Sequence, residues 1–300
     1  MPMTRRDALA LLLASVPAAL LAGCGGGGGD SGNGQTNHSR SRYIALGDSY
    51  AYGYSTQPGT PTGLGDIGYV KLFANVLAAS NGGVRPEVLN LAIPGETTTT
   101  FLRPGNGTPA LPYNQNYAAT GSPSQFSLLE QHTYLLPAEE SIRWVTLQIG
   151  GDDLLHLLVD PAFRAADSDE RQALIAATLE TFSANLRVIL ARMARIRSLT
   201  PSVRLFVLGY PDPFEGLGIA NPLSGLSTPL AQQVNSVISK AASEVSAIYV
   251  DVFTPFVGHE AALSLITTTQ DPPGSGIPDF HPSAAGYAKI AELLVAANQQ

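Results

Sequence analysis

The sequence alternates short apolar runs, rich in β-branched and aromatic residues, with longer segments whose apolar residues recur at helical spacing. Strands separated by helices pair in parallel, and a parallel sheet needs cover on both faces. We therefore expect one α/β domain, a three-layer α/β/α sandwich around a five-stranded parallel sheet. The expected strands are Tyr43–Leu46, Val88–Ile93, Trp144–Ile149, Val203–Leu208 and Ala247–Val252, and the expected helices are Gly68–Ala79, Ala173–Ile196, Pro229–Val245 and Ser283–Ala297.

The first forty residues carry a different kind of pattern. Arg5-Arg6 precede an apolar stretch from Ala8 to Ala22 that is short for a membrane-spanning helix, and Leu21-Ala22-Gly23-Cys24 resembles a bacterial lipobox. The pattern predicts a signal peptide over 1–23, a lipidated Cys24, a Gly-rich flexible tether over 24–41 and a folded domain over 42–300. It places the protein in the cell envelope, held to a membrane through Cys24, on the periplasmic or outer-membrane side in a Gram-negative host.

Charge and cysteine content exclude several classes of partner and chemistry. The formal charge of -7 comes without a basic tract, which argues against nucleic acid as a partner. Cys24 is the one cysteine, so the mature chain has no intrachain disulfide, thiol nucleophile or thiolate metal site. Asp152, Asp153 and His156 lie in one short segment without a partner cluster, so we expect neither a metal nor another cofactor. We expect Asp153 to cap the helix that follows the third strand.

Candidate chemistry gathers where the strands end. In parallel sheets, ligands bind at the carboxyl ends of the strands. Ser49 follows the first expected strand, Gly95 the second, Gly150–Asp153 the third and Tyr210–Pro213 the fourth. A serine presented at a strand end and a histidine late in the chain, His281, can form a nucleophile and its base.

Four motifs follow one another in a specific order. They are Gly47-Asp48-Ser49, Asn90-Leu91-Ala92-Ile93-Pro94-Gly95 with Thr97-Thr98, Gly150-Gly151-Asp152-Asp153-Leu154, and Asp279-Phe280-His281-Pro282 with Gly286-Tyr287. Together they resemble the SGNH (GDSL-type) hydrolases, which are esterases, lipases, lysophospholipases and carbohydrate-ester deacetylases on a flavodoxin-like sheet. The resemblance spans about residues 42–297 and implies Ser49 as nucleophile, the backbone N–H groups of Ser49 and Gly95 as oxyanion donors, and His281 as general base and acid.

The chain departs from the family pattern at two positions. Asp152 stands where the family has an Asn whose amide completes the oxyanion hole, and an ionised carboxylate offers no donor. Either Asp152 is protonated by burial and donates, or it turns away, or the enzyme is slow or inactive. The family's triad acid comes three residues before the histidine, whereas Asp279 comes two before His281. Either Asp279 still reaches the imidazole, or a backbone carbonyl orients it.

We therefore predict an envelope-anchored serine ester hydrolase that works through an acyl-enzyme, without a cofactor, on a small-molecule or lipid ester. One alternative is a catalytically impaired envelope-binding protein that retains the hydrolase fold. Another is a carbohydrate-ester deacetylase with the same machinery. Two long segments, Pro94–Gln125 and Gly209–Ser227, are rich in loop-forming residues, and we expect them either to border the site or to be irregular surface.

Overall fold

The computed structural model describes residues 40–54, 68–103, 124–212, 227–260, 279 and 281–300. The predicted signal peptide, Cys24 and nearly all of the predicted tether lie outside these residues. The described strands form one parallel sheet in the order β2-β1-β3-β4-β5, which confirms the predicted fold class. The strands are β1 Arg40–Gly47, β2 Glu87–Asn90, β3 Glu140–Gln148, β4 Arg204–Leu208 and β5 Ile248–Val250.

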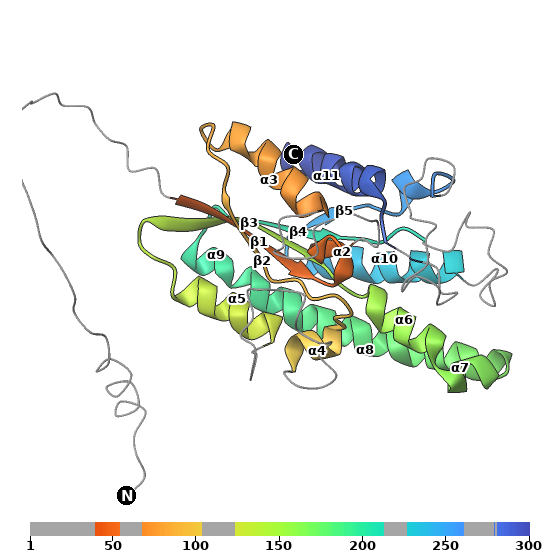
Figure 1. Ribbon diagram of the computed structural model, residues 1–300. Coiled ribbons are helices and arrows are strands. Elements are labelled where there is room, and N and C mark those ends of the chain that lie inside the picture. The colour runs from red at the N-terminus through yellow and green to blue at the C-terminus, as the bar shows by residue number, and fades with distance from the viewer. Residues whose placement is uncertain (1–39, 55–67, 104–123, 213–226, 261–278, 280) are drawn as a thin grey trace, which may run out of the picture. The chain divides into compact units, whose positions relative to one another are not determined.

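Helices cover both faces of this sheet (Figure 1). Helices α3 (Gly68–Ser80) and α11 (Ala284–Asn298) lie on one face, and α5 (Gln125–Tyr134), α8 (Ser168–Ala194) and α10 (Ser227–Glu244) lie on the other. Burial on both faces explains why the centre of β1 is a continuous apolar run, Tyr43 to Leu46, with no exposed surface. The shorter helical elements are α2 Ser49–Tyr52, α4 Thr98–Leu102, α6 Gly151–Val159, α7 Pro161–Ala165, α9 Ile196–Leu199 and the 3-10 turn η2 Thr254–Phe256.

The ends of several elements differ from prediction. Strand β1 begins at Arg40, so the last two residues of the predicted tether pair with Glu140 and Ser141 of β3. Strand β2 ends at Asn90 and not at Ile93, because the Asn90 side chain accepts a hydrogen bond from the Ala92 N–H and turns the chain. Ser283 is the N-cap of α11, as predicted, and accepts from the Gly286 N–H at 3.1 Å.

Helix α4 lies inside the segment 94–125, which was predicted to be a loop. Thr97 and Thr100 form a capping box that satisfies the first N–H groups of this five-residue helix. The prediction that Asp153 caps α6 is wrong, because α6 has Gly150 at its N-cap and no side-chain cap. Asp153 instead accepts from the N–H and hydroxyl of Thr98, at 2.9 and 2.6 Å, and thereby holds the first residue of α4. Residues 104–123 and 213–226 of the two long segments lie outside the described residues.

Candidate active site

Ser49 lies at a tight junction between β1 and α2. The residue before it in this junction, Asp48, is the N-cap of α2 and accepts from the Tyr50 N–H at 3.0 Å. Gly47 has φ +133°, and a Cβ there would lie 1.9 Å from the carbonyl oxygen of Gln148. Backbone geometry thus requires Gly47, Asp48 caps the helix, and Ser49 is left partly exposed at the first position of the helix.

His281 and Asp279 form a hydrogen-bonded pair. The imidazole Nδ1 lies 2.5 Å from Asp279 Oδ1, and the same oxygen accepts from the His281 backbone N–H at 2.9 Å. Asp279 is 1% exposed, and the imidazole packs against the ring of Tyr54 with centroids 4.6 Å apart. An Nδ1–H tautomer donates to Asp279 and leaves Nε2 free to accept a proton. The spacing of two residues therefore brings this carboxylate to the imidazole.

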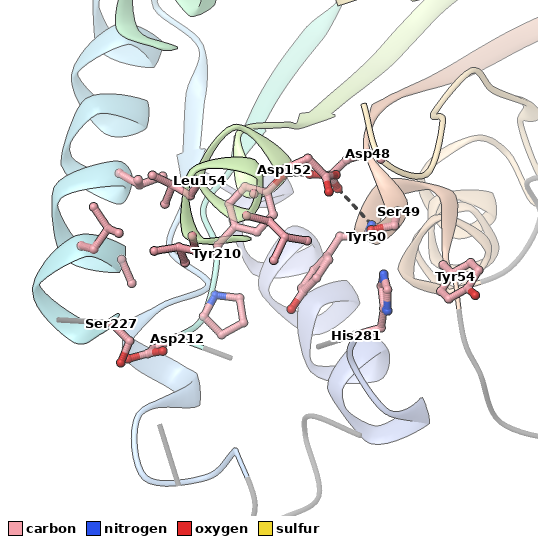
Figure 2. Close-up of a pocket in the computed structure, with 18 of the residues that line it drawn as sticks. Asp48, Ser49, Tyr50, Tyr54, Asp152, Leu154, Tyr210, Asp212, Ser227 and His281 are labelled. Carbon is pink, nitrogen blue, oxygen red and sulfur yellow. Dashed lines mark hydrogen bonds between the residues drawn. The ribbon is translucent and has the colours of Figure 1, made fainter. Parts of the chain in front are cut away.

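Ser49 and His281 lie at one end of a shared cavity, with Ser49 above the imidazole in the view of Figure 2. Within the described residues the Ser49 hydroxyl makes no hydrogen bond. Such contacts are often long in ligand-free enzymes and tighten only when substrate is bound. Gly95, which follows β2 with φ +80°, borders the same cavity, as does Asp152.

Gln125 joins the Ser49 junction to the Gly95 loop. Its amide nitrogen donates to the Gly47 carbonyl at 2.6 Å and to Glu96 Oε2 at 3.0 Å, and its amide oxygen accepts from the Gly47 N–H at 2.9 Å. Glu96 is almost fully buried, and burial raises its pKa to about 7, with hydrogen bonds from Thr100 and Gln125 opposing the shift. Sequence reasoning missed Gln125, which lies in none of the four motifs, and gave no role to Glu96, although it stands between Gly95 and Thr97 of the second motif.

Tyr210 supports Asp48 from the end of β4. Its hydroxyl donates to Asp48 Oδ2, and its backbone is fixed by Asn235, which accepts from the Tyr210 N–H at 2.9 Å and donates to its carbonyl at 2.8 Å. Burial raises the pKa of Asp48, and the hydrogen bonds from Tyr210 and Tyr50 oppose this shift. The sequence placed residue 210 at the correct edge of the sheet, but nothing in it indicated this contact with the residue before the nucleophile.

Asp152 enters the cavity from the start of α6. Gly150 has φ +121°, and a Cβ there would lie 2.5 Å from the ring of Phe182, so this junction is also tightly packed. The Asp152 side chain is 9% exposed. Burial raises its pKa well above the usual range, and the charges of Asp48, Asp153 and Glu96 raise it further. Among the described residues, no group of three or more His, Cys, Asp or Glu side chains is arranged to hold a metal ion.

The cavity has a volume of about 360 Å³ and runs from Ser49 and His281 into a space between α6 and α10 (Figure 2). Its inner wall is apolar. The residues that form this wall are Leu154, Leu155 and Leu158 of α6 and Leu230, Ala231 and Val234 of α10. A cavity of this size and character suits a small organic ligand or part of one.

Solved structures with a similar fold include lipases. The phospholipase A1 of Streptomyces albidoflavus has a TM-score of 0.55 and 22% identity, with 85% of this chain and 98% of that chain covered. The extracellular lipase of Streptomyces rimosus has a TM-score of 0.55 and 22% identity, over 86% and 99% of the two chains. A lipase from a goat rumen metagenome has a TM-score of 0.56 and 17% identity, over 85% and 96%.

No curated protein sequence matches the chain. At the identities of the solved structures, the likeness establishes the fold. The sequence profile described as "GDSL-like Lipase/Acylhydrolase family" matches residues 45–289, which is most of the chain, and this confirms the resemblance drawn from the motifs. The chain therefore belongs to the GDSL-like lipase/acylhydrolase family and is a carboxylic ester hydrolase.

Proposed function

We propose that the protein hydrolyses esters of apolar acyl groups through an acyl-enzyme on Ser49. One observation carries this proposal: Ser49 and the Asp279–His281 pair lie at one end of a cavity whose interior is apolar. The carbonyl group of an ester would lie at the polar end of the cavity, beside Ser49 and His281. Its acyl chain would extend into the apolar space between α6 and α10.

The reaction would begin when Ser49 Oγ attacks the ester carbonyl carbon while His281 Nε2 takes the hydroxyl proton. The carbonyl electron pair moves to oxygen, where the N–H groups of Ser49 and Gly95 donate to the oxyanion. Collapse of this intermediate expels the alcohol, which takes the proton from His281. Water then attacks the acyl-serine with His281 as base and releases the carboxylic acid. Asp279 stabilises the imidazolium in both steps.

The test is hydrolysis of p-nitrophenyl acetate, butyrate and octanoate by residues 24–300, which keep the whole of β1, with Ser49→Ala as the control. Each buried methylene contributes about 0.8 kcal/mol, so kcat/KM should rise roughly tenfold from acetate to butyrate. The serine variant should lose turnover by several orders of magnitude. Wild-type rates equal to those of Ser49→Ala would refute the proposal and favour a binding protein without catalytic activity.

The acyl site can be tested by filling it. Ala231 is 9% exposed and lines the cavity from α10. The substitution Ala231→Phe should lower kcat/KM for the octanoate ester much more than for the acetate ester, because the added ring occupies the space of the longer chain. Gln233→Phe adds the same ring at an exposed position of α10 and should leave the chain-length profile unchanged. Parallel losses for all three esters in Ala231→Phe would place the acyl chain elsewhere.

We also propose that the mature protein is anchored to the cell envelope through lipidated Cys24. The support is the sequence Leu21-Ala22-Gly23-Cys24, followed at once by five glycines, Gly25 to Gly29. Cys24→Ser should move the protein from the membrane fraction to the soluble fraction of cells that produce the full chain. Unchanged membrane association of this variant would contradict a lipid anchor at Cys24.

A further inference from the structure

Four acidic side chains lie near one another behind the nucleophile, at the ends of β1, β2 and β3, and three of them are held by hydrogen-bond donors. The fourth, Asp152, accepts no hydrogen bond within the part of the chain that the structure describes. The donors to the other three are the Tyr210 hydroxyl and Tyr50 N–H for Asp48, the Thr98 N–H and hydroxyl for Asp153, and the Gln125 amide for Glu96.

Asp152 is thus the acid that these surroundings least allow to ionise. It is buried in the cavity wall, and no described Lys, Arg or His forms an ion pair with it. A carboxylate that receives no donor from the described residues and lies in the wall of a largely apolar cavity is poorly solvated, so its neutral form is favoured. Asp48, which lies at the N-cap of α2, repels a negative charge on Asp152. Because Asp48 already accepts two hydrogen bonds, it is the one of this pair that ionises first.

Other titratable groups also face Asp152 or share its cavity. Glu96, from the loop after β2, and Asp153, on α6, add negative charge. Burial raises the pKa of Asp152, and the negative charges of these two acids raise it further. The remaining groups are Tyr50 of α2, Tyr210 after β4, and Asp212 and His281, which line the cavity.

We propose that Asp152 carries a proton in the active enzyme and that its carboxyl O–H donates a hydrogen bond to the oxyanion formed when Ser49 attacks the ester. This inference rests on the proposed function. Asp152 lines the same cavity as Ser49 and Gly95, whose N–H groups would be the other donors. A neutral carboxylic acid can replace a side-chain amide in this role, since each presents one hydrogen to the developing charge. The enzyme therefore depends on a proton that an amide would not need.

The measurement is kcat and KM for p-nitrophenyl butyrate from pH 5 to pH 10, in wild type, Asp152→Asn and Asp152→Ala. Wild-type kcat should fall about tenfold per pH unit once Asp152 ionises, whereas Asp152→Asn should not show this fall, because an amide cannot lose its proton. At pH values where Asp152 keeps its proton, Asp152→Ala should have a kcat about 10²–10³ below wild type, with KM little changed, because the donor acts only on the oxyanion. Glu180→Gln removes an exposed carboxylate of α8 and should follow wild type.

A second readout does not depend on activity. An acid whose pKa is raised in the folded state destabilises the protein as pH rises from its unfolded value of about 4 toward its folded value. The melting temperature of wild type relative to Asp152→Asn should therefore fall over this range, and that of Glu180→Gln should not change relative to wild type. Parallel melting curves for wild type and Asp152→Asn at all pH values would show that Asp152 has an ordinary pKa and would overturn the inference.

The kinetic outcomes separate this inference from the proposed function. Absence of Ser49-dependent turnover in wild type would refute the proposed function, and the role of Asp152 with it. Serine-dependent turnover with Asp152→Ala within about threefold of wild-type kcat would refute the inference alone. The same alkaline fall in wild type and Asp152→Asn would also refute it, because the titrating group would then be another one.

Discussion

At the scale of single residues, the carboxylate of Asp279 orients His281, the proposed general base. It accepts from both the imidazole Nδ1 and the His281 backbone N–H, so it fixes the ring and the tautomer together. Asp279→Asn should lower kcat by about 10³–10⁴, because an amide neither selects the Nδ1–H tautomer nor stabilises the imidazolium. The rate of p-nitrophenyl butyrate hydrolysis measures this loss, and Asp169→Asn, at an exposed site, is the matched control. A loss below tenfold would show that His281 is oriented without this carboxylate.

Some features of the site could be predicted from the sequence and others could not. Ser49, Gly95 and His281 could be located because each lies in a motif at the end of an element, and the sheet brings such ends together. The hydrogen bonds of Tyr210 and Gln125 could not be predicted, because their partners are 162 and 78 residues away and depend on the strand order. The position of Asp152 was predictable, but its protonation depends on which neighbouring acids receive donors, and only the folded structure shows that.

At the scale of elements, the junction from β1 to α2 determines where the nucleophile lies. Gly47→Ala should destabilise the protein strongly or prevent folding, because the new methyl group would overlap the Gln148 carbonyl of β3. Gly83→Ala is the matched control, since Gly83 has φ +84° but a Cβ added there would meet no other atom within 4 Å. The control should cost only the backbone strain of about 1–2 kcal/mol. Urea unfolding of both variants gives the comparison, and equal losses would show that contact with β3 is not the cause.

Elements were predictable where their pattern was long and local. Helix α8 carries a buried stripe that includes Phe182, Leu186 and Met193, and its helical spacing is clear in the sequence. The short helix α4 was missed because its stability depends on a capping box and on the distant carboxylate of Asp153. Strand β2 was predicted to end three residues too late because Leu91 and Ile93 are buried like strand residues and still donate to Ala45 and Gly47.

At the scale of the whole molecule, the parallel sheet collects acidic groups in a region that water hardly reaches. The carboxyl ends of β1, β2 and β3 meet at one edge, and Asp48, Glu96, Asp152 and Asp153 all have pKa values raised chiefly by burial. Most acids in proteins have lowered pKa values and so favour the folded state as pH rises. These four act in the opposite direction, so the site that presents the nucleophile reduces the stability of the fold as pH rises above the ordinary pKa values of these acids.

Glu96 allows this effect on stability to be measured apart from the proposed oxyanion donor. Its pKa is raised from 4.5 to about 7, so the folded state binds its proton more tightly than the unfolded state does. The wild-type free energy of unfolding should therefore fall, relative to Glu96→Gln, as pH rises from 4.5 to 7 and then level off. The shift corresponds to at most about 3 kcal/mol. A change in the free energy of unfolding that comes from the amide itself is the same at every pH. It therefore does not alter how the difference between the two proteins depends on pH.

Urea unfolding at intervals from about pH 4.5 to about pH 8.5 gives this difference directly. Glu180→Gln, which removes an exposed carboxylate of α8, should differ from wild type by a constant amount. A constant difference for Glu96→Gln as well would mean that Glu96 ionises in the folded protein as readily as in the unfolded chain. Burial at the edge of the sheet would then be insufficient to raise the pKa values of its carboxyl groups. A growing difference would show that this fold keeps carboxyl groups neutral beside its nucleophile.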